Sequence, residues 1–341
     1  MMLRQPAEWM RHGALWSAWP SAADLWQEDL DAARAEVAAL YAAIADVDPA
    51  TGQPRGEALN ILVHGDEARD SAAVALAGLG ATLIDIPFGD IWLRDTAPIF
   101  VVDDAHRLAA ASFGFNGWGG KYDLPHDAGV SRAIAAASGL PTHRFDWVLE
   151  GGSIDVDGAG RGLTTEQCLL NRNRNPDLDR ATIERYLAEQ LGVSVPVWLG
   201  EGLANDHTDG HIDNLARFVA PGVAVVPEAR DSDDPNTEVY RDARQRLRAA
   251  GLEVVTVPSV GRLENEDGDV VPASYMNFYI ANTTVVVPTY GSRWDDAAVE
   301  AIGRLFPGRR AVGCRANAIL TGGGSFHCIT QQVPSLPLEE I

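Results

Sequence analysis

The chain has 341 residues, 46% of them hydrophobic, and its 48 Asp and Glu outnumber its 27 Lys and Arg, which gives a formal net charge of −21. An acidic excess of this size disfavours binding to nucleic acid or to an anionic membrane, and it mildly concentrates small cations. The length and the hydrophobic content together permit a large buried core.

Cysteine and lysine usage narrows the class of protein further. The three cysteines include no CxxC pair, so they predict neither a disulfide framework nor a zinc knuckle, and they favour a reducing compartment. Lys121 is the single lysine and no GxxxxGK[ST] motif occurs, which excludes P-loop chemistry. The N-terminus lacks the apolar core of a signal peptide, and no run approaches the roughly 20 apolar residues of a membrane span. We therefore expect a soluble, cytoplasmic protein.

Helical and β-rich segments alternate along the chain. An opening amphipathic helix is predicted near 24–45, with one apolar face formed by Leu30, Val37, Leu40, Tyr41 and Ile44. Further helices are predicted to begin near Glu67, Asp127, Asp179, Thr237 and Asp295, so that their starts are 60, 52, 58 and 58 residues apart. Short β-rich runs lie between them, at 61–64, 82–86, 223–226, 254–257 and 284–287. This regular spacing suggests about five repeated α/β units, and no linker-like stretch divides residues 1–341.

Two clusters in the first half of the chain place carboxylates beside aromatic or glycine residues. Trp92 is bracketed by Asp90, Arg94 and Asp95. An aromatic face beside carboxylates suits a flat cation, which stacks on the ring while the oxygens hold its N–H groups. The same cluster is also typical of a surface salt bridge beside a core tryptophan. Glu150 adds another acid next to a glycine pair, which by itself can mark only a β-bulge.

The segment 205–214, Asn-Asp-His-Thr-Asp-Gly-His-Ile-Asp-Asn, concentrates two histidines and three aspartates between apolar stretches. Such a density of titratable groups is costly near a core unless the groups pair, so it marks a candidate site. Three interpretations remain open. The segment is a solvated loop, or a strand on which His211 and Asp213 share one face as an acid-oriented histidine, or a metal site that uses His207, His211 and the aspartates.

A glycine-rich stretch near the C-terminus, 320–332, leads directly into a His-Cys pair at positions 327 and 328. Glycines allow a ligand to approach the backbone closely, a context that suits a nucleophilic cysteine. The alternative is a glycine bend that ends a buried strand, with Cys328 as a small apolar residue. Cys168 lies inside an apolar run and is expected to belong to the core.

Taken together, these segments resemble the agmatine deiminase and bacterial-type peptidylarginine deiminase family of the guanidine-modifying superfamily. The resemblance rests on eight blocks in the order of the family. They are 5–9 with 16–20, 92–95, 115–120, 149–153, 163–171, 210–214, 273–278 and 320–332. Members of this family form a five-bladed, pseudo-symmetric α/β propeller with a central active site, and they work without a metal or other cofactor. The resemblance therefore implies the same fold, with one group of site residues from each repeated unit.

Carried over residue by residue, the resemblance implies that Cys328 is the nucleophile and His211 the general acid/base. Asp95, Glu150 and Asp213 become the carboxylates around the guanidinium. The implied residues of the substrate slot are Asp90, Trp92, Trp118, Gly323 and Gly324. The chemistry agrees, because a delocalised guanidinium carbon needs a strong nucleophile and a cation held firmly in position.

The implied reaction is hydrolysis of agmatine to N-carbamoylputrescine and ammonia through a covalent S-amidino adduct on Cys328. A deiminase of another guanidine, such as arginine, a peptidyl arginine or a guanidino acid, remains open. So do an amidinotransferase and a catalytically silent guanidine-binding protein. The expected partner is a small cationic guanidine, and assembly into a homo-oligomer is compatible with the family.

The sequence departs from the family pattern where the amine end of the substrate is expected. The family usually carries Asp-Gly-Phe before its first block, whereas this chain begins Met1-Met2-Leu3. It also has His207-Thr208-Asp209-Gly210-His211 where Glu-Thr-Asn-Gly-His is common, and Ala97 where glycine is usual. We expect Asp206 or Asp209 to receive the ammonium end instead.

Overall fold

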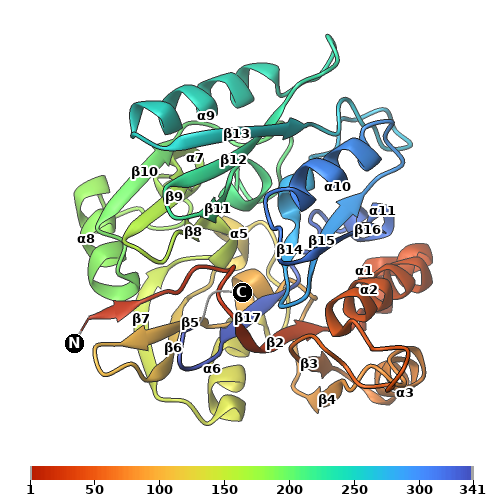
Figure 1. Ribbon diagram of the computed structural model, residues 1–341. Coiled ribbons are helices and arrows are strands. Elements are labelled where there is room, and N and C mark those ends of the chain that lie inside the picture. The colour runs from red at the N-terminus through yellow and green to blue at the C-terminus, as the bar shows by residue number, and fades with distance from the viewer. Residues whose placement is uncertain (1, 339–341) are drawn as a thin grey trace.

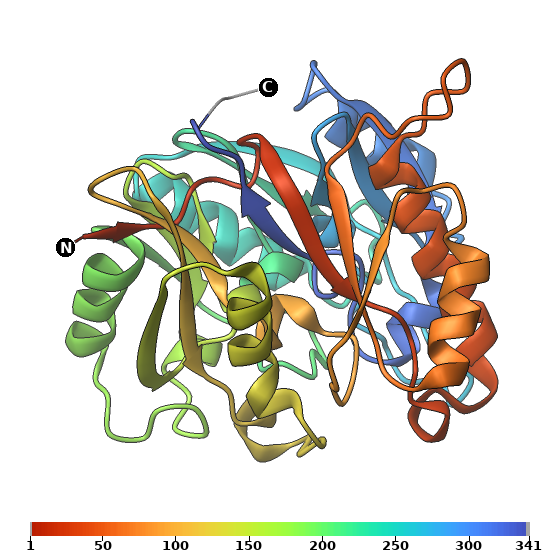
Figure 2. The same cartoon turned by 90° about the horizontal axis from the view of Figure 1, so that it is seen from below.

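A computed structural model describes residues 2–338, and its strands form five separate small sheets. Figure 1 shows the sheets arranged around a common centre, with the longer helices on the outside of the molecule. The view turned by 90° in Figure 2 shows helices α2 (Leu30–Ala45) and α3 (Asp66–Ala75) packed side by side along one end. Within residues 2–338, no helix is long and apolar enough to cross a membrane.

Each sheet contains the same arrangement: a first strand antiparallel to a second, and a third strand parallel to the second and reached through a helix. The second unit consists of β5 (Ile99–Asp103), β6 (Leu108–Gly114), α6 (Asp127–Ser138) and β7 (Thr142–Val148), and the third of β8 (Asp155–Val156), β9 (Arg161–Thr165), α8 (Arg180–Leu191) and β10 (Val195–Leu199). The fourth unit consists of β11 (Arg217–Ala220), β12 (Val223–Glu228), α9 (Thr237–Ala249) and β13 (Glu253–Pro258). The fifth consists of β14 (Tyr279–Ile280), β15 (Thr284–Thr289), α10 (Asp295–Gly303) and β16 (Arg310–Arg315).

The first unit joins the two ends of the chain. Its first strand is β17 (Gln331–Pro334), which pairs antiparallel with β2 (His12–Ala18), and α2 then leads to β3 (Ala58–Val63). Two strands extend the repeated pattern: β1 (Leu3–Arg4) lies beside β5, and β4 (Thr82–Asp85) follows α3 and lies beside β3. The α/β fold class expected from the sequence is therefore confirmed, and the described strands repeat one pattern in five sheets.

The prediction of which helix serves as the crossover helix of the first unit was wrong. The helix predicted near Glu67 exists as α3, but it connects β3 to the additional strand β4, and α2 is the crossover helix of its unit. The opening helix is also interrupted, because α1 (Ala23–Trp26) and a short 3-10 turn, η1 (Gln27–Asp29), precede α2. Gln27, the first residue of η1, has a φ of 47°, which a continuous α-helix excludes. All five β-rich runs are strands, as expected.

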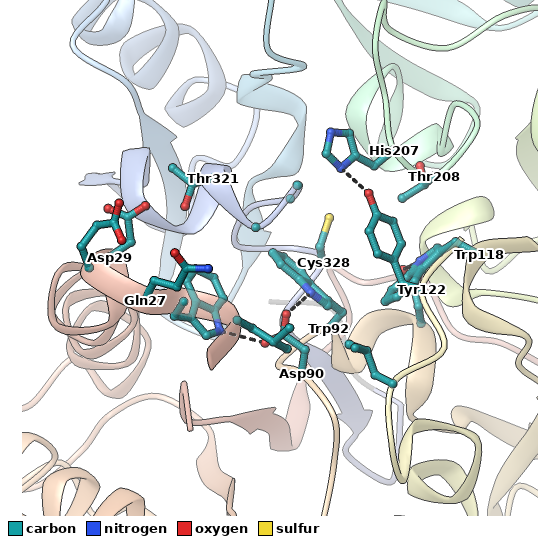
Figure 3. A pocket seen from close by; sticks show the side chains of 18 residues that line it. Gln27, Asp29, Asp90, Trp92, Trp118, Tyr122, His207, Thr208, Thr321 and Cys328 are labelled. Atoms are coloured by element: carbon teal, nitrogen blue, oxygen red, sulfur yellow. Dashed lines mark hydrogen bonds between the residues drawn. The ribbon is translucent and has the colours of Figure 1, made fainter. Parts of the chain in front are cut away.

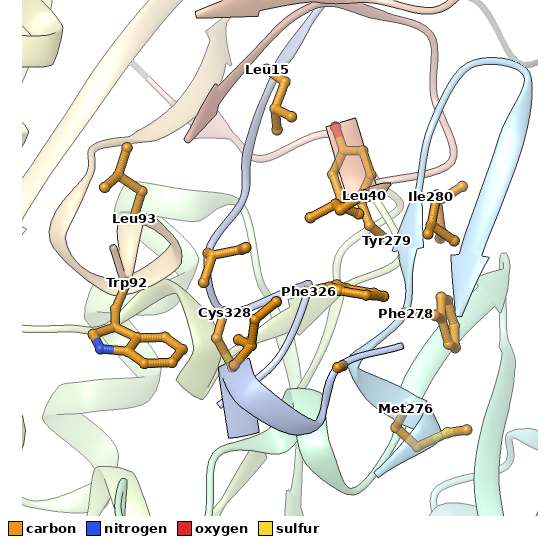
Figure 4. Packing of buried hydrophobic residues seen from close by; sticks show 14 of the residues in the cluster. Leu15, Leu40, Trp92, Leu93, Met276, Phe278, Tyr279, Ile280, Phe326 and Cys328 are labelled. Atoms are coloured by element: carbon orange, nitrogen blue, oxygen red, sulfur yellow. The ribbon is translucent and has the colours of Figure 1, made fainter. Parts of the chain in front are cut away.

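The sheets pack their apolar faces into a large core near the centre of the molecule. Figure 4 shows residues from different units meeting there: Leu15 of β2 and Phe326 from the first, Leu93 from the second and Phe278 from the fifth, each almost completely buried. The central strands are rich in β-branched residues; β15 contains Val285, 286 and 287, all fully buried. Such runs are typical of strands that are covered on both faces.

A short helical turn precedes the first strand of every unit, at the central end of the sheets. These turns are α4 (Leu93–Thr96), η2 (Gly151–Ser153), η3 (Ile212–Asn214), η4 (Tyr275–Asn277) and the turn at 326–329. Successive turns contact one another, α4 with η2, η2 with η3, and η3 with η4. The fold thus gathers five segments that are far apart in the sequence around one point. The remaining short helices are α5 (Gly117–Gly120), α7 (Glu166–Leu169) and α11 (Asn317–Thr321).

Candidate active site

The five central turns carry the candidate site residues. Asp95 lies on α4, Glu150 immediately precedes η2, and His211 immediately precedes η3, which contains Asp213. Cys328 lies on the turn before β17. The expectation that each unit supplies a separate group is met, and η4 adds a fifth contribution, Asn277, that the sequence analysis did not single out.

Cys328 lies beside a cavity of about 390 Å³. Figure 3 shows its sulfur between the ring of Trp92 on one side and the side chains of Tyr122 and His207 on the other. The residues that line this cavity are Leu25, Trp26, Gln27, Glu28, Asp29, Asp90, Trp92, Asp95, Trp118, Tyr122, Leu124, His207, Thr208, Thr321, Gly322, Gly323, Gly324 and Cys328. Every expected residue of the substrate slot except Asp206 and Asp209 is among them.

Two aspartates fix the aromatic walls of the cavity. Asp90 accepts hydrogen bonds from the indole N–H of Trp26 at 2.9 Å and of Trp92 at 2.7 Å, and burial raises the pKa of its carboxyl group. The indole of Trp118 donates to Asp95 at 2.8 Å. Both oxygens of Asp90 accept hydrogen bonds from indoles, so Asp90 orients the ring on which a planar cation would stack. Direct binding of the cation by Asp90 stays a prediction.

The sulfur of Cys328 is contacted by a neutral donor and by a carboxylate. Asn277 donates from Nδ2 to Sγ at 3.1 Å, and Asp213 Oδ2 lies 3.6 Å from Sγ. Burial and the charges of Asp213 and Asp95 raise the pKa of the Cys328 thiol well above its usual value, and only the donors to sulfur oppose this. The uncharged thiol is therefore the resting form at neutral pH.

The orientation of the Asn277 amide is fixed by its other contacts. Its oxygen accepts the backbone N–H groups of His327 at 2.8 Å and Cys328 at 3.2 Å, and Nδ2 also donates to Asn214 at 2.9 Å. Because the oxygen is used by two N–H donors, the nitrogen must face the sulfur.

His211 is completely buried between two carboxylates. Nε2 lies 3.6 Å from Glu150 Oε2 and Nδ1 lies 3.8 Å from Asp95 Oδ2, and neither nitrogen has a hydrogen-bond partner among the described residues. Burial opposes protonation, but Asp95, Glu150 and the neighbouring Cys168 raise the pKa of His211 well above its usual value. A protonated imidazole is therefore available as an acid in the resting protein.

Gly152 makes this close approach of His211 possible. A Cβ at this position would lie 2.6 Å from His211 Nδ1 and 2.9 Å from Asp95 Oδ1, and both distances are shorter than the contacts that Cβ atoms make in proteins. The backbone N–H of Gly152 also donates to Asp95 at 2.9 Å. The glycine pair at 151–152 therefore belongs to the site and does not merely mark a bulge.

Glu150 is oriented by a buried arginine. Arg174 donates from Nε to Glu150 Oε1 at 2.8 Å, and both side chains are completely buried. Burial opposes ionisation of Glu150, but His211 and Arg174 hold its pKa below the usual value, so it is ionised.

The segment around His211 differs from the strand considered in the sequence analysis. It forms a 3-10 turn, and the turn directs His211 toward Asp95 and Glu150 while Asp213 pairs with His327 Nδ1 at 2.8 Å. The other ring nitrogen of His327 bonds to Glu8 at 2.7 Å. Asp213 therefore does not orient His211 by a hydrogen bond, because a one-turn helix does not keep residues i and i+2 on one face.

The expected amine-end residues are also placed differently. Asp209 pairs with Lys121 at 2.5 Å and with Arg174, and Asp206 accepts a hydrogen bond from the backbone of Thr208 at 2.8 Å. Neither lines the cavity, and both carboxylates are paired with neighbouring groups. The acids that do line it beyond Asp90 and Asp95 are Glu28 and Asp29, on η1.

His207 and His211 do not form the metal site considered as an alternative. His207 accompanies Tyr122 at the cavity wall, with Nδ1 3.0 Å from the tyrosine hydroxyl, whereas His211 is completely buried. The His, Cys and carboxylate atoms that do converge among residues 2–338 belong to Glu150, Cys168 and His211.

Comparison with known proteins agrees with this geometry. Residues 4–334 match the sequence profile of the Porphyromonas-type peptidyl-arginine deiminases. The chain belongs to this family. It is 36% identical over 359 residues to the agmatine deiminase of Stutzerimonas stutzeri, a match that covers 97% of this chain and 95% of the relative.

Solved structures of family members have the same fold. The chain is similar to the agmatine deiminase of Enterococcus faecalis, with a TM-score of 0.88, 31% identity and coverage of 99% of this chain and 96% of that one. It is also similar to a substrate-bound agmatine deiminase of C. jejuni, with a TM-score of 0.87, 25% identity and coverage of 98% and 97%. The resemblance inferred from the eight sequence blocks is thereby confirmed.

In this member of the peptidyl-arginine deiminase family, the residues that hold the catalytic groups were not predicted from the sequence. Asn277 and Glu8 lay inside two of the blocks that carried the resemblance, so a signal existed, but neither stood among other titratable residues. Arg174 lay outside every block. Its role became visible only when the fold placed its side chain against Glu150 and Asp209.

Proposed function

We propose that the chain, acting as one catalytic domain, hydrolyses agmatine to N-carbamoylputrescine and ammonia. The observation that carries the proposal is the arrangement around the sulfur of Cys328. This sulfur lies beside a cavity lined by Trp92 and Asp95. Behind this lining lie the buried carboxylates of Glu150 and Asp213 and the protonated His211, which lies between Asp95 and Glu150. A planar cation and a nucleophile brought together in this way undergo attack at the guanidinium carbon.

In the first half of the reaction, the guanidinium stacks beside Trp92 and its N–H groups bind Asp95, Glu150 and Asp213. The positive charge of the substrate favours loss of the thiol proton of Cys328 to solvent, and Asn277 donates to the resulting thiolate. The thiolate forms a bond to the guanidinium carbon, and protonated His211 gives its proton to the departing nitrogen. The C–N bond breaks, ammonia leaves, and a positively charged S-amidino adduct remains on sulfur.

In the second half, neutral His211 takes a proton from a water molecule that attacks the carbon of the adduct. The C–S bond then breaks, and the sulfur regains a proton as the ureido product leaves. One imidazole thus serves both halves, as acid in the first and as base in the second. Neither half requires a metal ion or another cofactor.

The lining of the cavity favours an ammonium at the far end of the substrate. Glu28 and Asp29 line the cavity beside Gln27, and none of the lining residues in the described chain is Lys or Arg. A free carboxylate, as in arginine or a guanidino acid, would find no cationic partner there and would lie beside two acids, of which Glu28 is exposed and Asp29 half-buried. Glu28 and Asp29 therefore replace Asp206 and Asp209 as the proposed residues for the amine end.

The test measures ammonia release from agmatine, arginine, a peptidyl arginine and a guanidino acid by wild-type protein and by Cys328→Ser. We expect turnover of agmatine, none in the serine variant, and mass labelling by a haloacetamidine at Cys328 that spares Cys168 and Cys314. Substantial activity of Cys328→Ser would overturn the covalent mechanism. Transfer of the amidino group to an added amine in preference to water would identify an amidinotransferase, and binding of guanidines without turnover would identify a binding protein. The cytoplasmic location and the homo-oligomer remain predictions.

A further inference from the structure

A second cysteine lies against the catalytic histidine. Glu150, Cys168 and His211 present one ligand atom each, and these three atoms lie within 4.8 Å of one another. All three side chains are completely buried. Cys168 belongs to the core, as its sequence context indicated, but on α7 its sulfur faces the polar site on one side.

The separations in this cluster are close to those of a preformed metal site. Glu150 Oε2 lies 3.6 Å from His211 Nε2 and 3.9 Å from Cys168 Sγ. Zinc bonds of about 2.0–2.3 Å in tetrahedral geometry place neighbouring ligand atoms roughly 3.3–3.6 Å apart. Glu150 Oε2 therefore lies within a few tenths of an ångström of these separations from both other atoms, and Cys168 Sγ lies within 4.8 Å of the histidine nitrogen.

The surroundings orient two of the ligands and leave their inner atoms free. Arg174 holds Oε1 of Glu150, which leaves Oε2 directed at the histidine and the cysteine. Asp95 lies 3.8 Å from the opposite nitrogen of His211, the position from which a carboxylate orients a metal-bound imidazole. Both nitrogens of His211 lack a hydrogen-bond partner among the described residues. The positive charge of Arg174 is itself compensated by Asp209.

We propose that Glu150, Cys168 and His211 form an inhibitory site for Zn²⁺. One sulfur, one nitrogen and one carboxylate oxygen are a donor set that suits zinc and not the harder ions Mg²⁺ or Ca²⁺, and a water molecule completes four coordination. Binding forms the Zn–S bond as the thiol of Cys168 loses its proton to solvent, and the Zn–N bond as protonated His211 loses its proton from Nε2. Because protons compete with the metal for the sulfur and the nitrogen, zinc affinity increases with pH.

Zinc bound in this way stops the proposed deimination, and this consequence rests on the proposed function. The metal occupies Nε2 of His211, which the reaction needs as an acid and a base, and an oxygen of Glu150, which the guanidinium needs. The inhibited and substrate-bound forms are therefore mutually exclusive. Zinc binding itself can be measured without any turnover, so failure of the site and failure of the proposed function are distinguishable.

The experiment uses Co²⁺ as a spectroscopic substitute and Zn²⁺ in equilibrium dialysis. We expect one equivalent of either ion to bind wild-type protein and the double variant Cys328→Ser/Cys314→Ser. In both proteins Co²⁺ should give a thiolate-to-cobalt charge-transfer band, because Cys168 is the only remaining thiol in the double variant. Cys168→Ser should lose the band and bind Zn²⁺ at least tenfold more weakly.

A melting curve checks that Cys168→Ser is folded, and the double variant tests the proposal even if it is not. Loss of the band in the double variant with retention in Cys168→Ser would place the metal on Cys328 or Cys314 and overturn the proposal. Absence of stoichiometric binding in both proteins would also overturn it. Zinc should in addition inhibit agmatine turnover by wild-type protein reversibly, with activity restored by chelator.

Discussion

Asn277 offers a direct test of how the structure sets the reactivity of Cys328. Its Nδ2 donates to the sulfur at 3.1 Å while its oxygen holds the backbone of residues 327 and 328. In Asn277→Asp an oxygen still accepts both backbone N–H groups, but the donor to sulfur is lost and a negative charge takes its place. In Asn277→Ala only the donor and the acceptor are lost. Both variants should therefore raise the pKa of the Cys328 thiol further.

The magnitude follows from the nature of the bond. A hydrogen bond to a charged group contributes about 1.5–3 kcal/mol, and 1.4 kcal/mol corresponds to about tenfold in an equilibrium. Below the pKa of the thiol, the thiolate population should fall roughly ten- to hundredfold in Asn277→Ala, and by at least as much in Asn277→Asp. The rate at which iodoacetamide alkylates Cys328 should fall by the same factor, because the thiolate is the reactive form.

Alkylation of Cys328 is followed by mass spectrometry as a function of pH. Asn282→Asp is the matched control, since Asn282 is a buried asparagine that bonds to both backbone groups of His12 and has no contact with sulfur. We expect the profile of the Asn277 variants to move to higher pH while that of Asn282→Asp coincides with wild type. An unchanged profile in folded Asn277 variants, or an equal displacement in the control, would refute the assignment.

Three further predictions concern the site, the substrate and the stability of the protein. Gly152→Ala should lower kcat for agmatine by about a hundredfold or more, because the added Cβ displaces His211, whereas Gly129→Ala, whose Cβ meets no atom within 4 Å, should retain activity; equal rates in both would contradict this role. Agmatine should exceed arginine in kcat/KM by on the order of a hundredfold, and comparable rates would remove the proposed amine end while leaving the chemistry intact. Burial raises the pKa of Asp127 to about 6, above that of the unfolded chain, so its ionisation costs stability as pH rises from about 4 to 6. Asp127→Asn, which keeps an oxygen for the N–H of Gly89, should thus gain about 2–3 kcal/mol over wild type between pH 4 and pH 7 in urea unfolding, and a difference independent of pH would be the contrary result.

The sequence by itself determined the kinds of group that form the site. The blocks around Trp92, Glu150, His211 and Cys328 are local, and each holds its chemistry within a few residues, so it can be read without knowing the fold. The β-branched runs and the helical periodicity likewise indicated repeated α/β units, because burial of one face leaves a periodic pattern in any segment. The repeat was misassigned only at Glu67, where an additional helix and strand follow the same pattern as a complete unit.

The tertiary structure decided which groups meet. One of the open interpretations had Asp213 orient His211, two residues away, but Asp213 bonds to His327, which is 114 residues away. Asp209 was expected to face the substrate, but Lys121 and Arg174 reach it from other units, and Asp90 is engaged by two indoles. A carboxylate buried by folding pairs with the hydrogen-bond donors that surround it, because the desolvation penalty of an unpaired buried carboxylate exceeds the net stabilisation from one hydrogen bond. Those donors arrive from distant parts of the chain, so residue types identify the participants whereas only the packing of the five turns determines the partners.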